Sequence, residues 1–157
     1  MAEDDGRQVA LGVCLDAGRV LLLRRAGPPW PGWWSLPGGK REKGEGLATT
    51  CRRELREELG LPAEVLGLRL LVAQRGLPPD SVAGGQWLFA LFACRVPDGD
   101  LPEDAAWFPV ERALAELPLL PTDRTFLRDV LAGGGWGRFR RSVARWDGPA
   151  PEVVEYA

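Results

Sequence analysis

Histidine is absent from the 157 residues, and this absence excludes several kinds of active site. Without an imidazole, the chain has no Ser-His or Cys-His nucleophile pair, no histidine metal ligand and no side chain that ordinarily titrates near neutral pH. Any acid–base chemistry must therefore come from carboxylates, lysine or tyrosine. Tyrosine occurs once, whereas aspartate and glutamate together number 22.

Closely spaced cysteines, long apolar runs and an excess of one charge are also lacking. Cys14, Cys51 and Cys94 are far apart in the sequence and lack the paired spacing of zinc or dithiol sites, so we expect buried, reduced thiols in a cytoplasmic protein. No apolar run approaches the ~20 residues that span a bilayer, and the acidic start lacks the features of a signal peptide. The net charge of -2 argues against general binding to nucleic acid or anionic membranes.

The length suits a single domain over residues 1–157, with a core at about 9–132 and a C-terminal extension at 133–157. Apolar runs bounded by turn residues predict strands, and helical spacing of apolar residues predicts helices. The predicted strands are 9–15 and 19–24, which form a hairpin, then 33–36, 65–74, 86–96 and 107–110. A Pro-Gly-Gly turn is predicted at 37–39, and helices are predicted at 47–59, 110–117 and 122–131.

The helix predicted at 47–59 carries three carboxylates on one side. Glu54, Glu57 and Glu58 fall within one ~100° arc of a helix, where like charges repel by a few tenths of a kcal/mol per pair. Folding gives no reason to gather them, but a divalent cation does, because clustered carboxylates without Cys or His are the ligands of Mg²⁺ or Mn²⁺. The alternative is an ordinary solvated helix face. The helix start also lacks a Ser, Thr, Asp or Asn cap, and such conflicts often mark working sites.

The residues around this helix match a longer pattern. The fixed positions of the Nudix box, G-x5-E-x7-R-E-U-x-E-E-x-G-U with U apolar, are occupied by Gly39, Glu45, Arg53, Glu54, Glu57, Glu58 and Gly60. Seven fixed residues recur by accident on the order of once in 10⁸ windows. The chain therefore resembles the Nudix (MutT-like) hydrolases, and the similarity extends to residues 21–25, 36–39 and 107–109.

The resemblance implies an α+β fold in which a mixed sheet is sandwiched between helices (α/β/α). It implies Mg²⁺, or Mn²⁺, as the cofactor, held by Glu57, Glu58 and the Gly38 carbonyl, with Glu54 either a further ligand or the carboxylate that deprotonates water. These three glutamates would be the catalytic residues. Gly39, Glu45, Arg53 and Gly60 would be structural, with Arg53 and Glu45 holding the loop and the helix in register.

Residues outside the box are further candidates. In this family an additional carboxylate from a loop often joins the metal site, and Glu103 and Asp104 stand at such a place; the alternative is that they are ordinary loop charges. Arg25 ends a predicted strand and is either a substrate contact or a solvated charge. Leu36 is a second candidate for substrate contact. Asp123 is either an acceptor for a purine edge or a plain helix cap.

The implied reaction is hydrolysis of a nucleoside diphosphate linked to another group. Divalent ions neutralise the charge of a diphosphate and lower the pKa of a coordinated water, whose proton a carboxylate can accept. We expect a Mg²⁺-dependent pyrophosphohydrolase for a small nucleotide, such as a nucleoside triphosphate or modified triphosphate. The alternatives are an ADP-ribose or nucleotide-sugar pyrophosphatase and a domain that senses nucleotides without turnover. The expected partners are the nucleotide and a second copy of the chain, with neither membrane nor nucleic acid.

Overall fold

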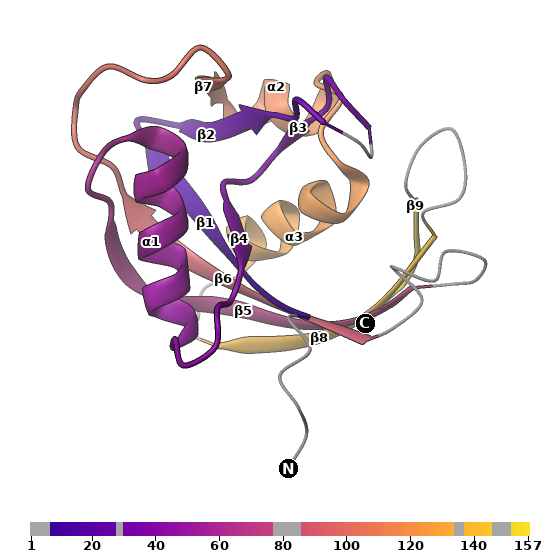
Figure 1. Cartoon of the computed structure of the whole chain (residues 1–157). Helices are drawn as coiled ribbons and strands as arrows, with labels where there is room; N and C mark the ends of the chain where they lie inside the picture. The colour runs from indigo at the N-terminus through magenta and orange to yellow at the C-terminus, as the bar shows by residue number, and fades with distance from the viewer. Residues whose placement is uncertain (1–6, 28–29, 77–85, 134–136, 146–151) are drawn as a thin grey trace.

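The computed structural model describes residues 7–27, 30–76, 86–133, 137–145 and 152–157. These residues form nine strands and three helices (Figure 1). The strands are β1 Gln8–Asp16, β2 Arg19–Arg24, β3 Trp34–Ser35, β4 Gly38–Lys40, β5 Glu64–Gly76, β6 Gln86–Arg95, β7 Ala105–Pro109, β8 Arg138–Arg145 and β9 Glu152–Tyr156. The helices are α1 Leu47–Leu59, α2 Val110–Ala115 and α3 Pro121–Ala132. No helix in this described part is long and apolar enough to cross a bilayer.

Strand β1 gives the sheet its mixed character. It pairs antiparallel with β2 and β4 but parallel with β6. The sheet order is β3-β2-β1-β6-β5-β8-β9, with β4 beside β1 and β7 beside β2. The predicted hairpin of β1 and β2 is confirmed, although it is paired only at Leu15–Val20 and Asp16–Arg19 before β1 turns to its other partners.

Helices cover both faces of the sheet, as Figure 1 shows for α1 and α3. Leu11 of β1 belongs to the same buried cluster as Phe126 of α3, whereas Ala10 belongs to the cluster that contains Leu55 of α1. Successive side chains of a strand point to opposite faces, so the continuous apolar run of β1 serves both cores. The expected α/β/α arrangement of an α+β fold is therefore confirmed.

The predicted Pro-Gly-Gly turn at 37–39 is wrong. Gly38–Lys40 forms β4, which pairs with Val9–Leu11 of β1. The two glycines favour a turn in the sequence, but a turn is not needed to satisfy their backbone N–H and C=O groups, because pairing with β1 does so. This pairing places the glycine segment between β1 and α1.

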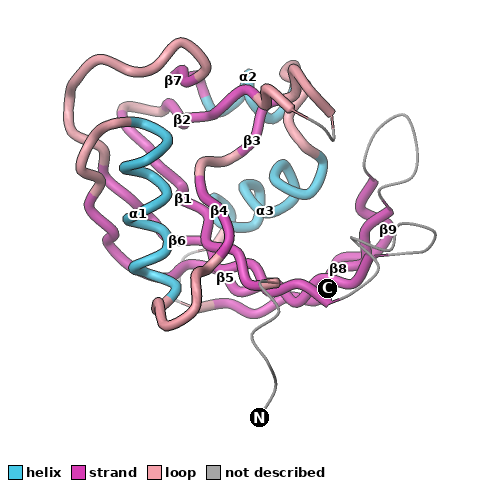
Figure 2. The backbone as a smooth tube through the Cα atoms, in the orientation of Figure 1, coloured by secondary structure: helices cyan, strands magenta, loops and turns pink. Residues whose placement is uncertain are grey.

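Residues beyond 132, expected as an extension, continue the sheet. Figure 2 shows β8 and β9 as further strands of the sheet, after α3 in the chain. β8 pairs parallel with β5, and β9 pairs antiparallel with β8. The carboxylate of Asp129 in α3 forms ion pairs with Arg138 and Arg140 of β8 and accepts a hydrogen bond from the Tyr156 hydroxyl of β9 at 2.6 Å. The arginine-rich sequence did not indicate this placement.

The three cysteines are buried and free of disulfides, as expected, but they are not apart in space. The Sγ atoms of Cys51 in α1 and Cys94 in β6 lie 3.7 Å apart, and Cys14 of β1 is paired in register with Cys94. The close approach of α1 to the sheet brings them together. At Gly12 of β1, a Cβ atom would lie only 3.1 Å from Leu55 Cδ1 of α1.

Candidate active site

Helix α1 carries the three glutamates, and glycines stand at both of its ends. It spans Leu47–Leu59, as predicted, and Gly60 ends it in the left-handed conformation at φ 71°. Gly46, at the N-terminal boundary, makes no side-chain cap. Glu45 compensates in part, because its carboxylate accepts a hydrogen bond from the Thr50 hydroxyl at 3.2 Å and so ties the preceding loop to the first turn of the helix.

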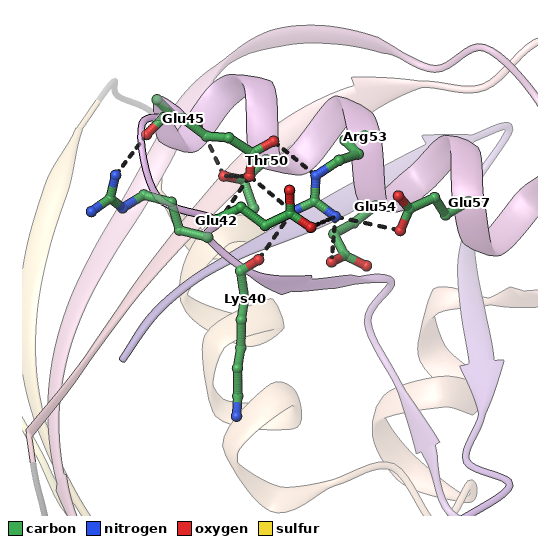
Figure 3. Close-up of polar contacts among 9 residues, drawn as sticks. Lys40, Glu42, Glu45, Thr50, Arg53, Glu54 and Glu57 are labelled. Carbon is green, nitrogen blue, oxygen red and sulfur yellow. Dashed lines mark hydrogen bonds and ion pairs between the residues drawn. The ribbon is translucent and has the colours of Figure 1, made fainter. Parts of the chain in front are cut away.

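Arg53 organises the carboxylates of the loop and the helix (Figure 3). Its Nε and Nη2 donate to the two oxygens of Glu45, each at 2.8 Å, in a bidentate pair that lowers the pKa of Glu45 to about 2. Its Nη1 lies 2.9 Å from Glu54 Oε1 and 3.4 Å from Glu57 Oε2. Nη2 also donates to the Lys40 carbonyl at 3.1 Å. Arg53 thus joins the loop, β4 and α1.

The glycine segment of β4 lies directly against the glutamates. The Gly38 N–H donates to Glu58 Oε1 at 3.0 Å, and Gly38 has φ +146°, a conformation that L side chains rarely adopt. A Cβ atom on Gly39 would lie 2.6 Å from Glu54 Oε1. Only glycine leaves room here for the carboxylates of α1 to reach the backbone.

A cavity of about 630 Å³ lies beside these groups. Its lining comes from α1, α3, five strands and the loops between them, and it combines carboxylates, cations and apolar side chains. The carboxylates are Glu57, Glu58, Asp104 and Asp123, the cations are Arg24, Arg25 and Lys40, and the apolar residues include Val9, Leu11, Leu36, Phe89 and Leu120. Such a lining suits a ligand that carries both anionic groups and an apolar ring.

Glu58 is the most perturbed carboxyl of the glutamate cluster. Burial raises its pKa to about 8, and repulsion from the nearby Glu54 and Asp104 contributes, against the opposing effect of the Gly38 N–H. A carboxyl in this position gains from a nearby cation, which would favour its ionised form.

The glutamates do not form a ready-made cation site as they stand. Within the described ranges, no group of three or more acidic or cysteine side chains is placed to hold a metal ion. Arg53 accounts for part of this, because it draws Glu54 and Glu57 to itself. A bound cation would compete with this guanidinium for Glu57, whose side chain is 59% exposed and able to move.

Three of the four other predicted site residues line the cavity, and one does not. Arg25, Leu36 and Asp123 all line the cavity. Glu103 does not line it, whereas its neighbour Asp104 does, and the Asp104 carbonyl accepts a hydrogen bond from the Arg24 N–H at 2.7 Å. Of the two candidates, Asp104 is therefore the one beside the cavity, and its role as a ligand stays a prediction.

The alternative that Asp123 is a helix cap is wrong. Helix α3 begins one turn earlier than that alternative requires, with Leu120 at the cap position and Pro121 as its first residue. Asp123 is 6% exposed, and its Oδ2 accepts a hydrogen bond from the Leu36 N–H at 2.8 Å, across 87 residues of sequence. Burial raises its pKa to about 6, against the opposing effects of the Leu36 N–H, the Thr122 hydroxyl and the charge of Arg25.

Lys40 and Phe89 line the cavity but were not predicted. Lys40 follows the glycine pair directly, a signal that could have been used. Figure 3 shows its side chain directed away from Arg53 and the glutamates around it. Its Nζ lies 5.4 Å from the centre of the Trp87 ring. Phe89 had no local signal, because an aromatic residue in an apolar strand is normally a core residue.

Comparison with known proteins decides the family. The family model of the NUDIX domain matches residues 6–130 of the chain. The chain belongs to the Nudix family. Among solved structures, the mutator MutT protein from Bacillus halodurans superposes on this Nudix chain with a TM-score of 0.70 at 25% identity, covering 96% of this chain and 95% of that one. The Nudix fold expected from the sequence is confirmed.

Curated relatives cover more than one activity. The NAD-capped RNA hydrolase NudC of Pseudomonas aeruginosa is 34% identical over 119 residues, or 76% of this chain and 41% of NudC. The human 8-oxo-dGDP phosphatase NUDT18 is 32% identical over 134 residues, or 79% of this chain and 38% of NUDT18. This Nudix chain thus spans about two-fifths of the length of both relatives.

Proposed function

We propose that this Nudix chain is a Mg²⁺-dependent hydrolase that cleaves a phosphoric anhydride bond in a nucleoside diphosphate linked to another group. The observation that carries the proposal is the cavity, which brings Glu57, Glu58 and Asp104 together with the cations Arg24 and Lys40. Carboxylates without imidazole or thiolate suit a hard divalent ion, and cations suit phosphate oxygens.

The donor set beside β4 fits Mg²⁺ in its chemistry. Glu57, Glu58 and the Gly38 carbonyl would hold the ion, with Glu54 or Asp104 as the further oxygen ligand. When bound, the ion would offset the charge of the diphosphate and make a water molecule more acidic. The crowding that raises the pKa of Glu58 supports this assignment, because a cation would relieve it.

The side chains of the protein supply the remaining chemistry. Arg24 and Lys40 form no ion pair within the described part of the chain, so both are available to phosphate oxygens. Glu54 is 18% exposed and is oriented by Arg53, and we assign it the acceptance of a proton from the attacking water when it is not itself a metal ligand. Arg53 and Glu45 are not substrate contacts in this proposal and act by holding α1 against β4.

Purine nucleoside di- and triphosphates, including oxidised ones, are the substrates that we propose first. The apolar lining beside Asp123, with Phe89 and Leu120, offers a surface for a base and an acceptor for its edge. The relative NUDT18, named an 8-oxo-dGDP phosphatase, supports this choice. The name of NudC favours a nucleotide-capped RNA as a second candidate. The cytoplasmic location and the association with a second copy remain predictions.

Hydrolysis of a substrate panel tests the proposal. The panel contains dGTP, 8-oxo-dGTP, 8-oxo-dGDP, ADP-ribose, a UDP-sugar and an NAD-capped RNA, each with Mg²⁺, with Mn²⁺ and with a chelator, and products are identified by chromatography. We expect turnover that depends on the divalent ion and is fastest for the purine di- or triphosphates. Tight nucleotide binding without turnover of any compound would contradict the proposal and favour a nucleotide-sensing domain.

A further inference from the structure

The segment from Leu36 to Gly38 is held at three consecutive residues by three different elements. The Leu36 N–H donates to Asp123 Oδ2 of α3 at 2.8 Å. The Pro37 carbonyl accepts a hydrogen bond from the Gly12 N–H of β1 at 2.8 Å, and the Gly38 N–H donates to Glu58 of α1 at 3.0 Å. The segment therefore connects Asp123 to Glu58, and both of these carboxylates line the cavity.

This segment needs external support because of its composition. Gly38 and Gly39 have wide conformational freedom, so their own sequence does not fix the orientation of their peptide groups. Pro37 has a restricted φ, which stiffens the link between Leu36 and Gly38. The bond from Asp123 holds the segment from α3, whereas Glu58 holds it from α1.

Both oxygens of the Asp123 carboxylate accept a hydrogen bond. One oxygen accepts from the Leu36 N–H, and the other accepts from the Thr122 hydroxyl at 3.2 Å. A carboxylate that is 6% exposed is costly to bury unless it is hydrogen-bonded, so the Leu36 N–H stabilises Asp123 as much as Asp123 orients Leu36.

We propose that Asp123 is a positioning residue, whose hydrogen bond to the Leu36 N–H holds the Gly38–Gly39 backbone in the orientation that the reaction requires. The inference rests on the proposed function, in which the Gly38 carbonyl contacts the divalent ion. It differs from a role in which Asp123 only accepts a hydrogen bond from the base. That role predicts an effect that depends on the presence of the base, whereas the positioning role predicts an effect on the turnover rate and ion binding for every substrate.

Three variants separate the two roles. Asp123→Ala removes the acceptor, whereas Asp123→Asn keeps an amide oxygen that can still accept from the Leu36 N–H. Asp129→Asn is the matched control, because it alters a second buried aspartate of α3 that does not line the cavity. The substrates are a purine triphosphate and ribose 5-triphosphate, which lacks a base.

The positioning role predicts the same result for both substrates. We expect Asp123→Ala to lower kcat by about 10- to 100-fold with either substrate, because small misplacements of reacting groups cost this much. We also expect weaker binding of Mn²⁺ to the nucleotide-free protein, measured by electron paramagnetic resonance. Asp123→Asn should recover most of both quantities, and Asp129→Asn should match the wild type. A rise in KM confined to the purine substrate, with kcat and Mn²⁺ binding unchanged, would overturn the proposal.

Hydrogen exchange of the nucleotide-free and metal-free protein tests the support without any reaction. The Leu36 and Gly38 amides should exchange at least about 10-fold faster in Asp123→Ala than in the wild type, with a smaller change at amides far from this segment. Wild-type exchange at Leu36 and Gly38 in Asp123→Ala would overturn the inference. If the wild-type chain hydrolyses nothing, the proposed function and the catalytic part of this inference both fail, while faster exchange would still establish the support itself.

Discussion

The two long helices carry their acidic residues in different ways. On α1, Glu54, Glu57 and Glu58 lie close together because helical spacing places them on one side, and they meet β4 and the cavity. On α3, Asp123 and Asp129 are both largely buried, and each binds a segment distant in sequence. The first arrangement concentrates negative charge and the second satisfies it with hydrogen-bond donors.

The two aspartates of α3 also differ from each other. Asp129 has a side chain that is 7% exposed and is paired with two arginines and a tyrosine, so its charge is neutralised. Asp123 is hydrogen-bonded to an N–H and a hydroxyl, and it lines the cavity. The ion pairs of Asp129 fit a structural role. Asp123, which is hydrogen-bonded to neutral donors, leaves a negative charge beside the cavity.

The largest expected effect is on the α1 glutamates. Glu54→Gln, Glu57→Gln and Glu58→Gln should each lower kcat by at least about 100-fold, because each removes a metal ligand or a proton acceptor. Steady-state hydrolysis with saturating Mg²⁺ measures this, and thermal unfolding should show that the fold is intact. Glu64→Gln, at an exposed carboxylate paired with Arg95, is the control and should leave kcat unchanged. Near-normal rates in all three α1 variants would refute the site.

A loss of stability is expected on α3. Asp129→Ala leaves Arg138 and Arg140 without their carboxylate and should lower the free energy of unfolding by about 2 kcal/mol, less than for a fully buried pair because both arginines are 34% exposed. This corresponds to a fall of about 4–8 °C in Tm. The specific activity of the folded fraction should not change. A lower kcat at unchanged Tm would mean that Asp129 contributes to the reaction and not to stability, contrary to the comparison of the two aspartates.

A smaller effect separates the two loop carboxylates. Asp104→Asn should raise the Mg²⁺ concentration for half-maximal activity by about 10-fold, because Asp104 lines the cavity near Glu58. Glu103→Gln should leave this concentration unchanged. The reverse result would favour Glu103, the other candidate from the sequence, as the further ligand.

The smallest effect is a pH dependence of stability without metal. The folded chain binds the Glu58 proton more tightly than the unfolded chain, since the pKa is raised from 4.5 to about 8. This stabilisation is present at low pH and is lost as the pH rises towards 8. The Tm in a chelator should therefore fall by a few degrees from pH 7 to pH 8.5, a range chosen above the pKa of about 6 for Asp123. Glu58→Gln should flatten this slope, and Mg²⁺ should stabilise the wild type more as the pH rises.

The sequence predicted well wherever the signal was local. The limits of α1 matched because the spacing of Cys51, Leu55 and Leu59 and the end at Gly60 depend only on near neighbours. The glutamates of α1 were recognised for the same reason. In contrast, no local feature of Asp123 distinguished a helix cap from a partner for Leu36, which is 87 residues away.

The order of residues alone determined helix α1, the hairpin of β1 and β2, the acidic cluster and the family pattern, because neighbours along the chain define these features. Only the tertiary structure decided that β4 lies between β1 and α1, that Asp104 lines the cavity in place of Glu103, and that β8 joins β5. Such contacts depend on how the sheet and the helices pack. A residue type cannot indicate its partner when many similar donors and acceptors lie elsewhere in the chain.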